Sequence, residues 1–318
     1  MMKRIIGLVA VVLCCVAAQG EEQTYAEKLG WPKGARVLMI HADDMGMSLA
    51  SNQGSIGCFE AGTVTSASIM MPCSWVPSAI AWANAHPDAC LGAHLTHTAE
   101  WDTYRWGPVA GRGTVPGLVD PNGYLYDNVA GVVAHASADE IETEIRAQIA
   151  LAKSMGLDIT HIDTHMGTLF ETPEYFERYL KVGVEMDIPI LMAGGHLTAA
   201  KEDLGEDLVA SITAIAPQVW AAGLPVLDDI DTRSYNWEGT DKKAHYIQAF
   251  RELKPGVTWF NTHPTAPTEE AKVITDNREK LWGDYYALTD PEVKKVIEEE
   301  GIILTTWREL HERRKNVK

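Results

Sequence analysis

Two adjacent carboxylates, Asp43 and Asp44, follow an apolar run in residues 37–46, which read V-L-M-I-H-A-D-D-M-G. The four apolar residues that begin this segment mix β-branched and long aliphatic side chains, a pattern that predicts a strand buried on both faces. Carboxylates at the outgoing end of such a strand lie at the rim of a core, where burial without a partner is costly. A metal ion or a reacting substrate would justify this placement, although Asp-Asp before Gly also forms ordinary polar turns.

Histidines stand in the same position in two other apolar segments. His94 lies near the end of L-G-A-H-L at 91–95, and His263 precedes a proline at the end of V-T-W-F-N-T-H-P. A lone histidine in such a place is more often a core or loop residue. The interpretation changes when several of them accompany carboxylates, because imidazole and carboxylate are the ligands that borderline divalent metals prefer.

A third segment, residues 158–165, concentrates these groups. It reads D-I-T-H-I-D-T-H, and if it is extended, His161, Asp163 and His165 project to one face. The sequence therefore predicts a cluster of imidazoles and carboxylates at the ends of several strands.

Apolar strands and amphipathic helices alternate from residue 35 onward, which predicts a parallel sheet with helical crossovers. Ser137 and Glu140 form a capping-box pattern at the start of one helix, and Pro173 and Pro291 each follow an N-cap residue. Eight strands are expected, near 36–41, 64–70, 90–95, 158–163, 188–192, 225–229, 257–261 and 302–305.

Eight strands favour an α/β fold in which a TIM-like barrel, distorted or regular, carries its chemistry at one end of the strands. An open α/β sheet is the alternative. No G-x-G-x-x-G motif follows the first strand, so nothing supports nucleotide binding.

Composition narrows the class of protein further. The chain has 318 residues, 46% of them hydrophobic, which is ample for a large core, and a formal net charge of −17. A charge of this sign argues against nucleic acid and anionic membrane surfaces as partners.

The first twenty residues resemble an export signal, with Lys3 and Arg4 before an apolar run that is too short for a membrane span. We expect cleavage near Gly20, an exported protein without stable membrane insertion, and one domain over 21–318. The mature chain would keep Cys58, Cys73 and Cys90 as its cysteines, which allows one disulfide but shows no disulfide framework.

Residues 97–136 interrupt the alternation with a long segment rich in Gly, Pro and aromatic residues. Trp101, Tyr104 and Trp106 could offer their faces to sugar rings, so a carbohydrate-binding loop is one interpretation. The other is that these rings anchor the loop to the body of the protein.

The assembled motifs resemble the YdjC-like carbohydrate deacetylases, the group that includes chitooligosaccharide deacetylases. The matching segments run in order through nearly the whole mature chain: H-A-D-D-M-G at 41–46, T-S-A-S-I-M at 65–70, L-G-A-H-L-T at 91–96, H-I-D-T-H at 161–165 and T-H-P at 262–264. The resemblance implies a distorted TIM-like barrel, a carbohydrate substrate and, as a further expectation, a homodimer.

The resemblance also implies roles for individual residues. It implies one divalent metal ion held by Asp44, His94 and His165, with Asp43 as the general base and His263 as the general acid. Mixed nitrogen and oxygen ligands favour zinc; cobalt, manganese and iron also fit, and magnesium fits less well.

Beyond these five residues, Asp163 is a candidate to orient a liganding histidine from behind, and His161 is expected to be structural. The resemblance assigns no role to His97. Members of the family often have a further histidine after the third motif, whereas this chain continues H-M-G-T-L-F from His165.

Three functions agree with these residues. The first is a metal-dependent hydrolase that removes N-acetyl groups from amino sugars or their oligosaccharides. The second keeps the metal but cleaves an amide or ester in a non-sugar molecule, because such ligands specify hydrolysis better than substrate. The third is a non-catalytic barrel that binds carbohydrate, which would need neither Asp43 nor His263.

Overall fold

The computed structural model describes residues 23–204 and 206–317. The expected signal peptide, residues 1–20, lies outside the described residues and stays a prediction. Three cysteines, Cys58, Cys73 and Cys90, are buried with free thiols. Among the helices of the described residues, none combines the length and apolar character that a membrane span requires.

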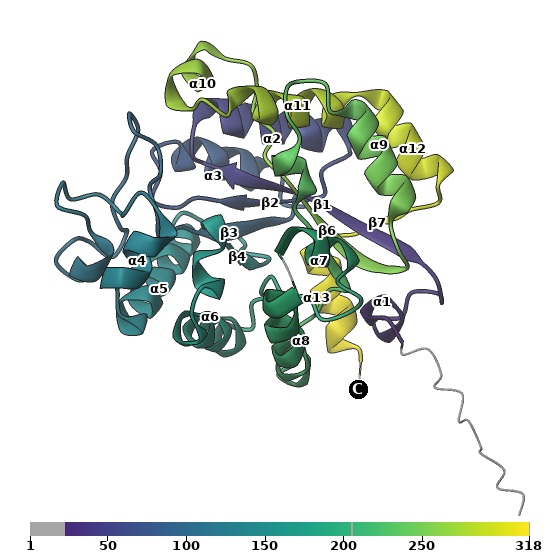
Figure 1. Ribbon diagram of the computed structural model, residues 1–318, viewed down its shortest axis with the longest axis horizontal. Coiled ribbons are helices and arrows are strands. Elements are labelled where there is room, and N and C mark those ends of the chain that lie inside the picture. The colour runs from purple at the N-terminus through teal and green to yellow at the C-terminus, as the bar shows by residue number, and fades with distance from the viewer. Residues whose placement is uncertain (1–22, 205, 318) are drawn as a thin grey trace, which may run out of the picture.

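One curved sheet of parallel strands forms the centre of the molecule (Figure 1). Its strands follow the order β4-β3-β2-β1-β6-β5, and β7 pairs with the first residues of β1 beside β2. The strands in chain order are β1 (Arg36–Met45), β2 (Ser66–Ile69), β3 (Leu91–Leu95), β4 (Ile162–Thr164), β5 (Asp229–Asp231), β6 (Gly256–Thr262) and β7 (Ile303–Leu304).

Two single-residue bridges continue the sheet beyond its edge strands. Ile162 of β4 bridges Ile190, and Ala193 bridges Leu227 just before β5, both in parallel. The sheet is thus curled into a distorted barrel, which confirms the predicted fold class.

Several strand ends differ from the sequence prediction, and the first strand continues past its expected end at residue 41 to Met45. The strand expected at 158–163 is shorter, begins at Ile162 and continues one residue further, and the one expected at 225–229 is found at Asp229–Asp231. The strand expected at 188–192 contributes only a bridge. Proline at position 189 explains part of this, because proline offers no amide hydrogen to a neighbouring strand.

Helices surround the sheet on both sides (Figure 1). The α-helices are α1 (Tyr25–Lys28), α2 (Leu49–Ala61), α3 (Val76–Ala85), α4 (Val129–His135), α5 (Ala138–Ser154), α6 (Pro173–Met186), α7 (Thr198–Leu204), α8 (Glu206–Ala221), α9 (Lys243–Glu252), α10 (Glu269–Ile274), α11 (Arg278–Thr289), α12 (Pro291–Glu299) and α13 (Trp307–Lys315). Short 3-10 helices are η1 (Pro116–Leu118), η2 (His165–Phe170) and η3 (Arg233–Asn236).

Helix starts agree with the local sequence signals. Ser137 and Glu140 form the expected reciprocal cap of α5, and Thr172 and Asp290 cap α6 and α12 ahead of their prolines. Each cap satisfies an amide at the start of a helix that has no partner within the helix itself.

The first strand separates two apolar clusters. Val37 and Met39 pack into one cluster, whereas Leu38 and Ile40 pack into the other with side chains of α9, α11 and α12. All four residues are at most 1% exposed. This burial on both faces explains why the strand is continuously apolar until its polar end.

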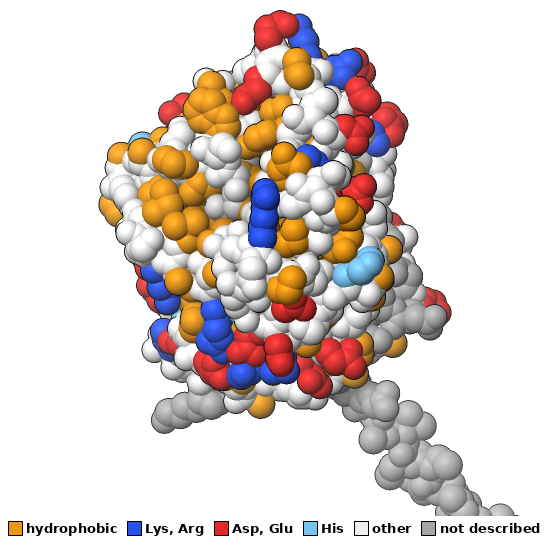
Figure 2. All heavy atoms as spheres, turned by 90° about the vertical axis from the view of Figure 1, so that its left-hand side faces the viewer, with side chains coloured by type: hydrophobic (Ala, Val, Ile, Leu, Met, Phe, Trp, Pro, Cys, Tyr) orange, Lys and Arg blue, Asp and Glu red, His pale blue; other side chains and the backbone are white. Residues whose placement is uncertain are grey.

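Residues 97–136 form a long excursion on one side of the barrel. Figure 2 looks at this side and shows apolar side chains gathered over part of the surface, while charged side chains concentrate toward the upper and lower edges.

Candidate active site

Asp43 and Asp44 reach the same site although they are neighbours in a strand. Regular alternation would send their side chains to opposite faces of the sheet. The pairing of β1 with β2 shifts register between Ala42 and Met45, and Asp44 has a left-handed backbone with φ of 63°. A local irregularity of this kind re-aims a side chain, so both carboxylates point into the barrel end.

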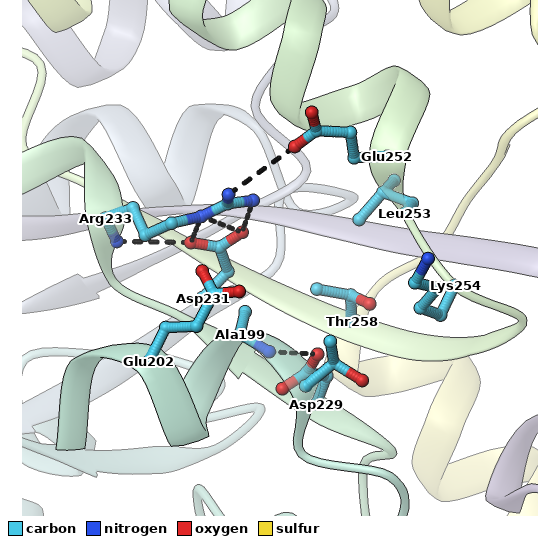
Figure 3. A pocket seen from close by; sticks show the side chains of 10 residues that line it. Ala199, Glu202, Asp229, Asp231, Arg233, Glu252, Leu253, Lys254 and Thr258 are labelled. Atoms are coloured by element: carbon cyan, nitrogen blue, oxygen red, sulfur yellow. Dashed lines mark hydrogen bonds and ion pairs between the residues drawn. The ribbon is translucent and has the colours of Figure 1, made fainter. Parts of the chain in front are cut away.

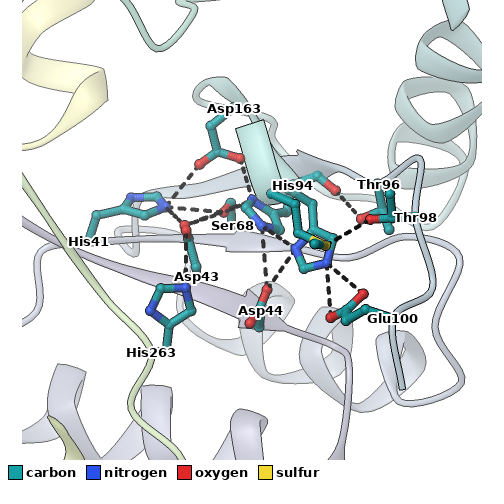
Figure 4. Close-up of polar contacts among 12 residues, drawn as sticks. His41, Asp43, Asp44, Ser68, His94, Thr96, Thr98, Glu100, Asp163 and His263 are labelled. Atoms are coloured by element: carbon teal, nitrogen blue, oxygen red, sulfur yellow. Dashed lines mark hydrogen bonds and ion pairs between the residues drawn. The ribbon is translucent and has the colours of Figure 1, made fainter. Parts of the chain in front are cut away.

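Three donor atoms from three strand ends converge, and one of them belongs to Asp44 (Figure 4). Asp44 Oδ1 lies 3.4 Å from His94 Nε2 and 3.3 Å from His165 Nδ1, and the two nitrogens are 3.1 Å apart. Ligands held about 2.0–2.2 Å from one zinc ion have separations of roughly this size. The sequence prediction named these same three residues as the metal set.

The state of Asp44 also fits a cation. Its Oδ1 is buried and has no hydrogen-bond partner among the described residues. Burial alone would raise the pKa of Asp44, but the imidazoles of His165 and His94 outweigh it and hold the pKa well below its usual value. The donor set is therefore compatible with one divalent metal ion.

Carboxylates stand behind both candidate histidine ligands. His94 Nδ1 lies 2.8 Å from Asp163 Oδ1, its register partner on β4, and both Glu100 oxygens lie 3.1 Å from His165 Nε2. A carboxylate on the far nitrogen fixes the tautomer and ring orientation of a metal-binding histidine. Asp163 was predicted in this position; Glu100 was not.

The same carboxylates affect protonation of the two histidines. Burial would lower the pKa of His165, but Glu100 and Asp44 outweigh burial and raise it to about 9. Burial would also lower the pKa of His94, but the carboxylates of Asp43 and Asp163 outweigh this effect and hold the pKa well above its usual value.

Two further buried imidazoles, those of His41 and His161, lie beside Asp163. His41 Nε2 lies 3.0 Å from Asp163 Oδ2, and His161 Nε2 lies 3.5 Å from the same oxygen. The His161 ring stacks on Trp307 and occupies space that a side chain at Gly92 would fill, since a Cβ there would meet it at 2.5 Å. These contacts agree with the structural role expected for His161.

His263 faces the other carboxylate of the pair. Its Nε2 lies 3.7 Å from Asp43 Oδ2, its backbone amide donates to Asp284, and the Tyr235 ring packs edge-on against it at 5.0 Å. Asp43 and His263 thus lie together at the edge of the predicted metal set (Figure 4).

The aromatic side chains of the 97–136 loop pack against the rest of the protein. Trp106 is buried and donates its indole hydrogen to the Thr98 carbonyl, and the Tyr104 hydroxyl donates to the Met47 carbonyl. Trp101 packs against the apolar core. These contacts anchor the loop in this conformation, and sugar contact by the three rings remains a prediction.

Sequence reasoning missed three residues of the site: His41, Ser68 and Glu100. His41 stands directly before the carboxylate pair and was therefore available as a signal. Ser68 and Glu100 are ordinary polar residues in the sequence, and only the packing of β2 and of the 97–136 loop brings them to the histidines.

Comparison with known proteins identifies the family. The model for YdjC-like protein matches residues 37–299. The chain belongs to the YdjC-like family.

Relatives in this family match it over most of their length. The carbohydrate deacetylase of Thermus thermophilus is 29% identical over 288 residues, which are 90% of this chain and 97% of the relative. The carbohydrate deacetylase of Thermoanaerobacter pseudethanolicus is 25% identical over 272 residues, 86% of this chain and 98% of the relative.

A solved structure supports the fold. The putative cellobiose-phosphate cleavage protein of Enterococcus faecalis superposes with a TM-score of 0.72 at 22% identity, over 87% of this chain and 99% of that one.

A separate pocket of about 440 Å³ lies beside β5 and β6 (Figure 3). Arg233 neutralises Asp231 at 2.8 Å, and Asp229 accepts a hydrogen bond from the Ala199 amide. These charged groups have partners within the protein, and no residue of the predicted site lines the pocket.

Proposed function

We propose that this YdjC-like protein is a metal-dependent carbohydrate deacetylase that hydrolyses the acetamide of acetylated amino sugars or their oligosaccharides. One observation carries the proposal: Asp44, His94 and His165 form a buried donor set, and Asp43 and His263 lie together beside it. The names of the two bacterial relatives support the substrate class.

The metal set has the composition of a hydrolytic centre. An aspartate and two histidines leave coordination positions open for water and substrate. A divalent metal bound there would polarise the acetamide carbonyl and lower the pKa of water. Asp163 and Glu100 orient the two imidazoles from behind.

Asp43 is the proposed general base. A metal held by Asp44, His94 and His165 leaves the neighbouring Asp43 carboxylate available to take a proton from the attacking water. The water oxygen then bonds to the carbonyl carbon. Asp43, His94 and Asp163 form another group of donor atoms that are close together, and metal content of Asp43→Asn separates the two arrangements.

His263 is the proposed general acid. Cleavage of the carbon–nitrogen bond requires a proton on the departing nitrogen, because the deprotonated amine (RNH⁻) is too poor a leaving group. His263 donates that proton as imidazolium and becomes neutral imidazole, and the products are acetate and the free amino sugar. The His263 ring lies 3.7 Å from Asp43, so the proposed acid and base can both reach the same acetamide group.

The test measures acetate release by the mature protein from N-acetylglucosamine oligomers, with acylated amides and esters of non-sugar molecules as the comparison panel. We expect acetate from the sugars. Release from non-sugar substrates alone would assign the same site to another amide or ester hydrolysis.

Binding of oligosaccharides without turnover of any acylated compound, in protein that contains metal, would instead assign the chain to the carbohydrate-binding function. Export after cleavage near Gly20 and assembly as a homodimer remain predictions of the sequence.

A further inference from the structure

His41 is a fully buried imidazole between two carboxylates that lie outside the metal set. Its Nε2 lies 3.1 Å from Asp43 Oδ1 and 3.0 Å from Asp163 Oδ2. Its side chain is 0% exposed, so the ring is shielded from bulk water. The proposed reaction gives this histidine no role.

Two serines of β2 complete the surroundings of the His41 ring. Nδ1 lies 2.9 Å from Ser66 Oγ, its register partner, and Nε2 lies 3.1 Å from Ser68 Oγ. Ser68 also lies 3.4 Å from Asp43 Oδ1, to which its hydroxyl donates. Both nitrogens of His41 therefore face oxygen atoms, an arrangement in which each nitrogen can carry a hydrogen.

These contacts distinguish the two oxygens of Asp43. Oδ1 faces His41 and Ser68 in the interior, whereas Oδ2 faces His263 at 3.7 Å. A carboxylate held through one oxygen cannot rotate freely, and the other oxygen is then fixed toward the reacting atoms. Positioning of this kind is worth much to catalysis, since about 1 Å of misplacement can cost roughly 100-fold in rate.

Charge balance gives a second reason for a cation at His41. Asp43, Asp44 and Asp163 are buried together, and among the described residues no lysine or arginine forms an ion pair with any of them. One divalent metal would offset two of the three negative charges. Uncompensated burial of the third would be costly, and an imidazolium can offset it.

The groups that face His41 come from its own strand and from neighbouring ones. They are Asp43 on β1, Asp163 and the neutral His161 at β4, and the Trp259 ring on β6 at 5.0 Å. Burial would lower the pKa of His41, but Asp163 and Asp43 outweigh it and raise the pKa.

We propose that His41 is a positioning residue that fixes Asp43 through its Oδ1, together with Ser68, and leaves Oδ2 as the oxygen that accepts the proton from water. The inference deepens the proposed function and rests on it. It assigns no metal to His41.

A rival account uses the same atoms differently. His41, His161 and Asp163 offer three buried donor atoms close enough to hold a second metal ion. Metal stoichiometry separates the two accounts, because a positioning histidine leaves one metal per chain in the wild type and in its variants.

The experiment compares His41→Leu, which removes both hydrogens and charge, with His41→Gln, which keeps a donor without the charge. The matched control is His97→Leu, which replaces another fully buried histidine whose pKa burial lowers to about 4. Each variant is first checked for a cooperative unfolding transition and for metal content.

We expect one metal per chain in all four proteins. His41→Leu should lower kcat about 100-fold with KM changed less than threefold, and His41→Gln should lose about tenfold. The control should keep the wild-type kcat and KM.

Two results would overturn the inference: kcat within threefold of wild type in His41→Leu, or a wild-type content of two metals per chain that falls to one in the variants. Nitrogen-15 NMR of the His41 ring in the metal-loaded wild type needs no turnover. It should show both ring nitrogens protonated at pH 7, and a neutral ring would contradict the inference even if no acetylated sugar proved to be a substrate.

Discussion

Asp43 and Asp44 differ by one position in the chain and are assigned to two different tasks. The register shift after Ala42 and the left-handed backbone of Asp44 place one carboxylate against His263 and the other against His94 and His165. Such a conformation is costly for a residue with a side chain and is found most often at functional sites.

Matched amide substitutions should separate these two tasks. Asp43→Asn should keep the metal and lower kcat by about 10²–10⁴-fold, because the amide cannot take a proton from water. Asp44→Asn should lose the metal, as should His94→Ala and His165→Ala. Metal content and steady-state kinetics on each purified variant provide the measurement. Full turnover by Asp43→Asn would refute its role as the base.

His97 should make the protein sensitive to mild acid. Burial lowers the pKa of His97 to about 4, against an ordinary value of 6.5 in the unfolded chain. The unfolded state therefore binds the proton more readily, and stability present above pH 6.5 is lost as the pH falls toward 4. Between pH 7 and 5 this histidine alone should cost about 2 kcal/mol.

Urea unfolding at the two pH values provides the check. His97→Leu should lose less of its free energy of unfolding than the wild type does, by about that amount. The exposed His135, replaced by Gln, serves as the control. Equal losses in wild type and His97→Leu would mean that His97 is already protonated, or equally accessible, in the folded protein.

At the residue scale the sequence allowed prediction of much of the site. Asp43, His94 and His263 were recognisable because polar side chains at the ends of apolar strands need a reason to be buried. The left-handed turn at Asp44 was not recognisable, since it depends on how β1 pairs with β2. Glu100 lacked any local signal because only the folding of a long loop brings it to His165.

Two elements carry the site in addition to the strands, and the first is the 97–136 loop. Tyr104 and Trp106 fasten it to the barrel, and Glu100 joins it to His165. The aromatic residues were expected either to bind sugar or to anchor the loop, and the contacts found for them anchor it. Through Glu100 the anchored loop is connected directly to His165 of the proposed metal set.

Removal of that connection should weaken metal binding. Glu100→Gln removes the charge behind His165 and should lower metal affinity about 10–100-fold, the usual effect of losing an outer carboxylate. Asp102→Asn, an exposed change two residues away, is the matched control. Calorimetric titration of metal-free protein measures both. Unchanged affinity in Glu100→Gln would show that Glu100 does not hold the histidine.

The second element is the segment around His263. Lys242 is buried, and its ammonium lies 2.8 Å from Asp284 Oδ1 and donates to the Ser234 carbonyl, while Asp284 Oδ2 accepts from the His263 amide. This ion pair connects η3, which carries Tyr235, with α11 and the end of β6.

Lys242→Met should therefore destabilise the protein by about 3–5 kcal/mol, because it leaves Asp284 buried without its cation. The double variant with Asp284→Asn should recover part of this loss, since the uncompensated charge is gone. Denaturant unfolding measures both proteins. If the double variant lost as much free energy of unfolding as the two single variants together, the two residues would not act as a pair.

The whole molecule follows from the alternation of strands and helices that the sequence shows. The parallel direction and seven of the eight expected strands were predictable, because apolar runs and helix caps are local signals. The short β4 and the single bridge at Ile190 were not, because closure of the curved sheet depends on contacts between distant segments. All five residues predicted for catalysis and metal binding lie together at one end of this barrel.

We propose that one metal ion at Asp44, His94 and His165 makes this barrel a deacetylase. The direct measurement titrates chelator-treated protein with a single metal, zinc first, while acetate release from N-acetylglucosamine oligomers is followed. We expect no acetate release from the metal-free protein and a linear recovery of activity that stops at one metal per chain. Undiminished acetate release from protein shown to contain no metal would contradict it.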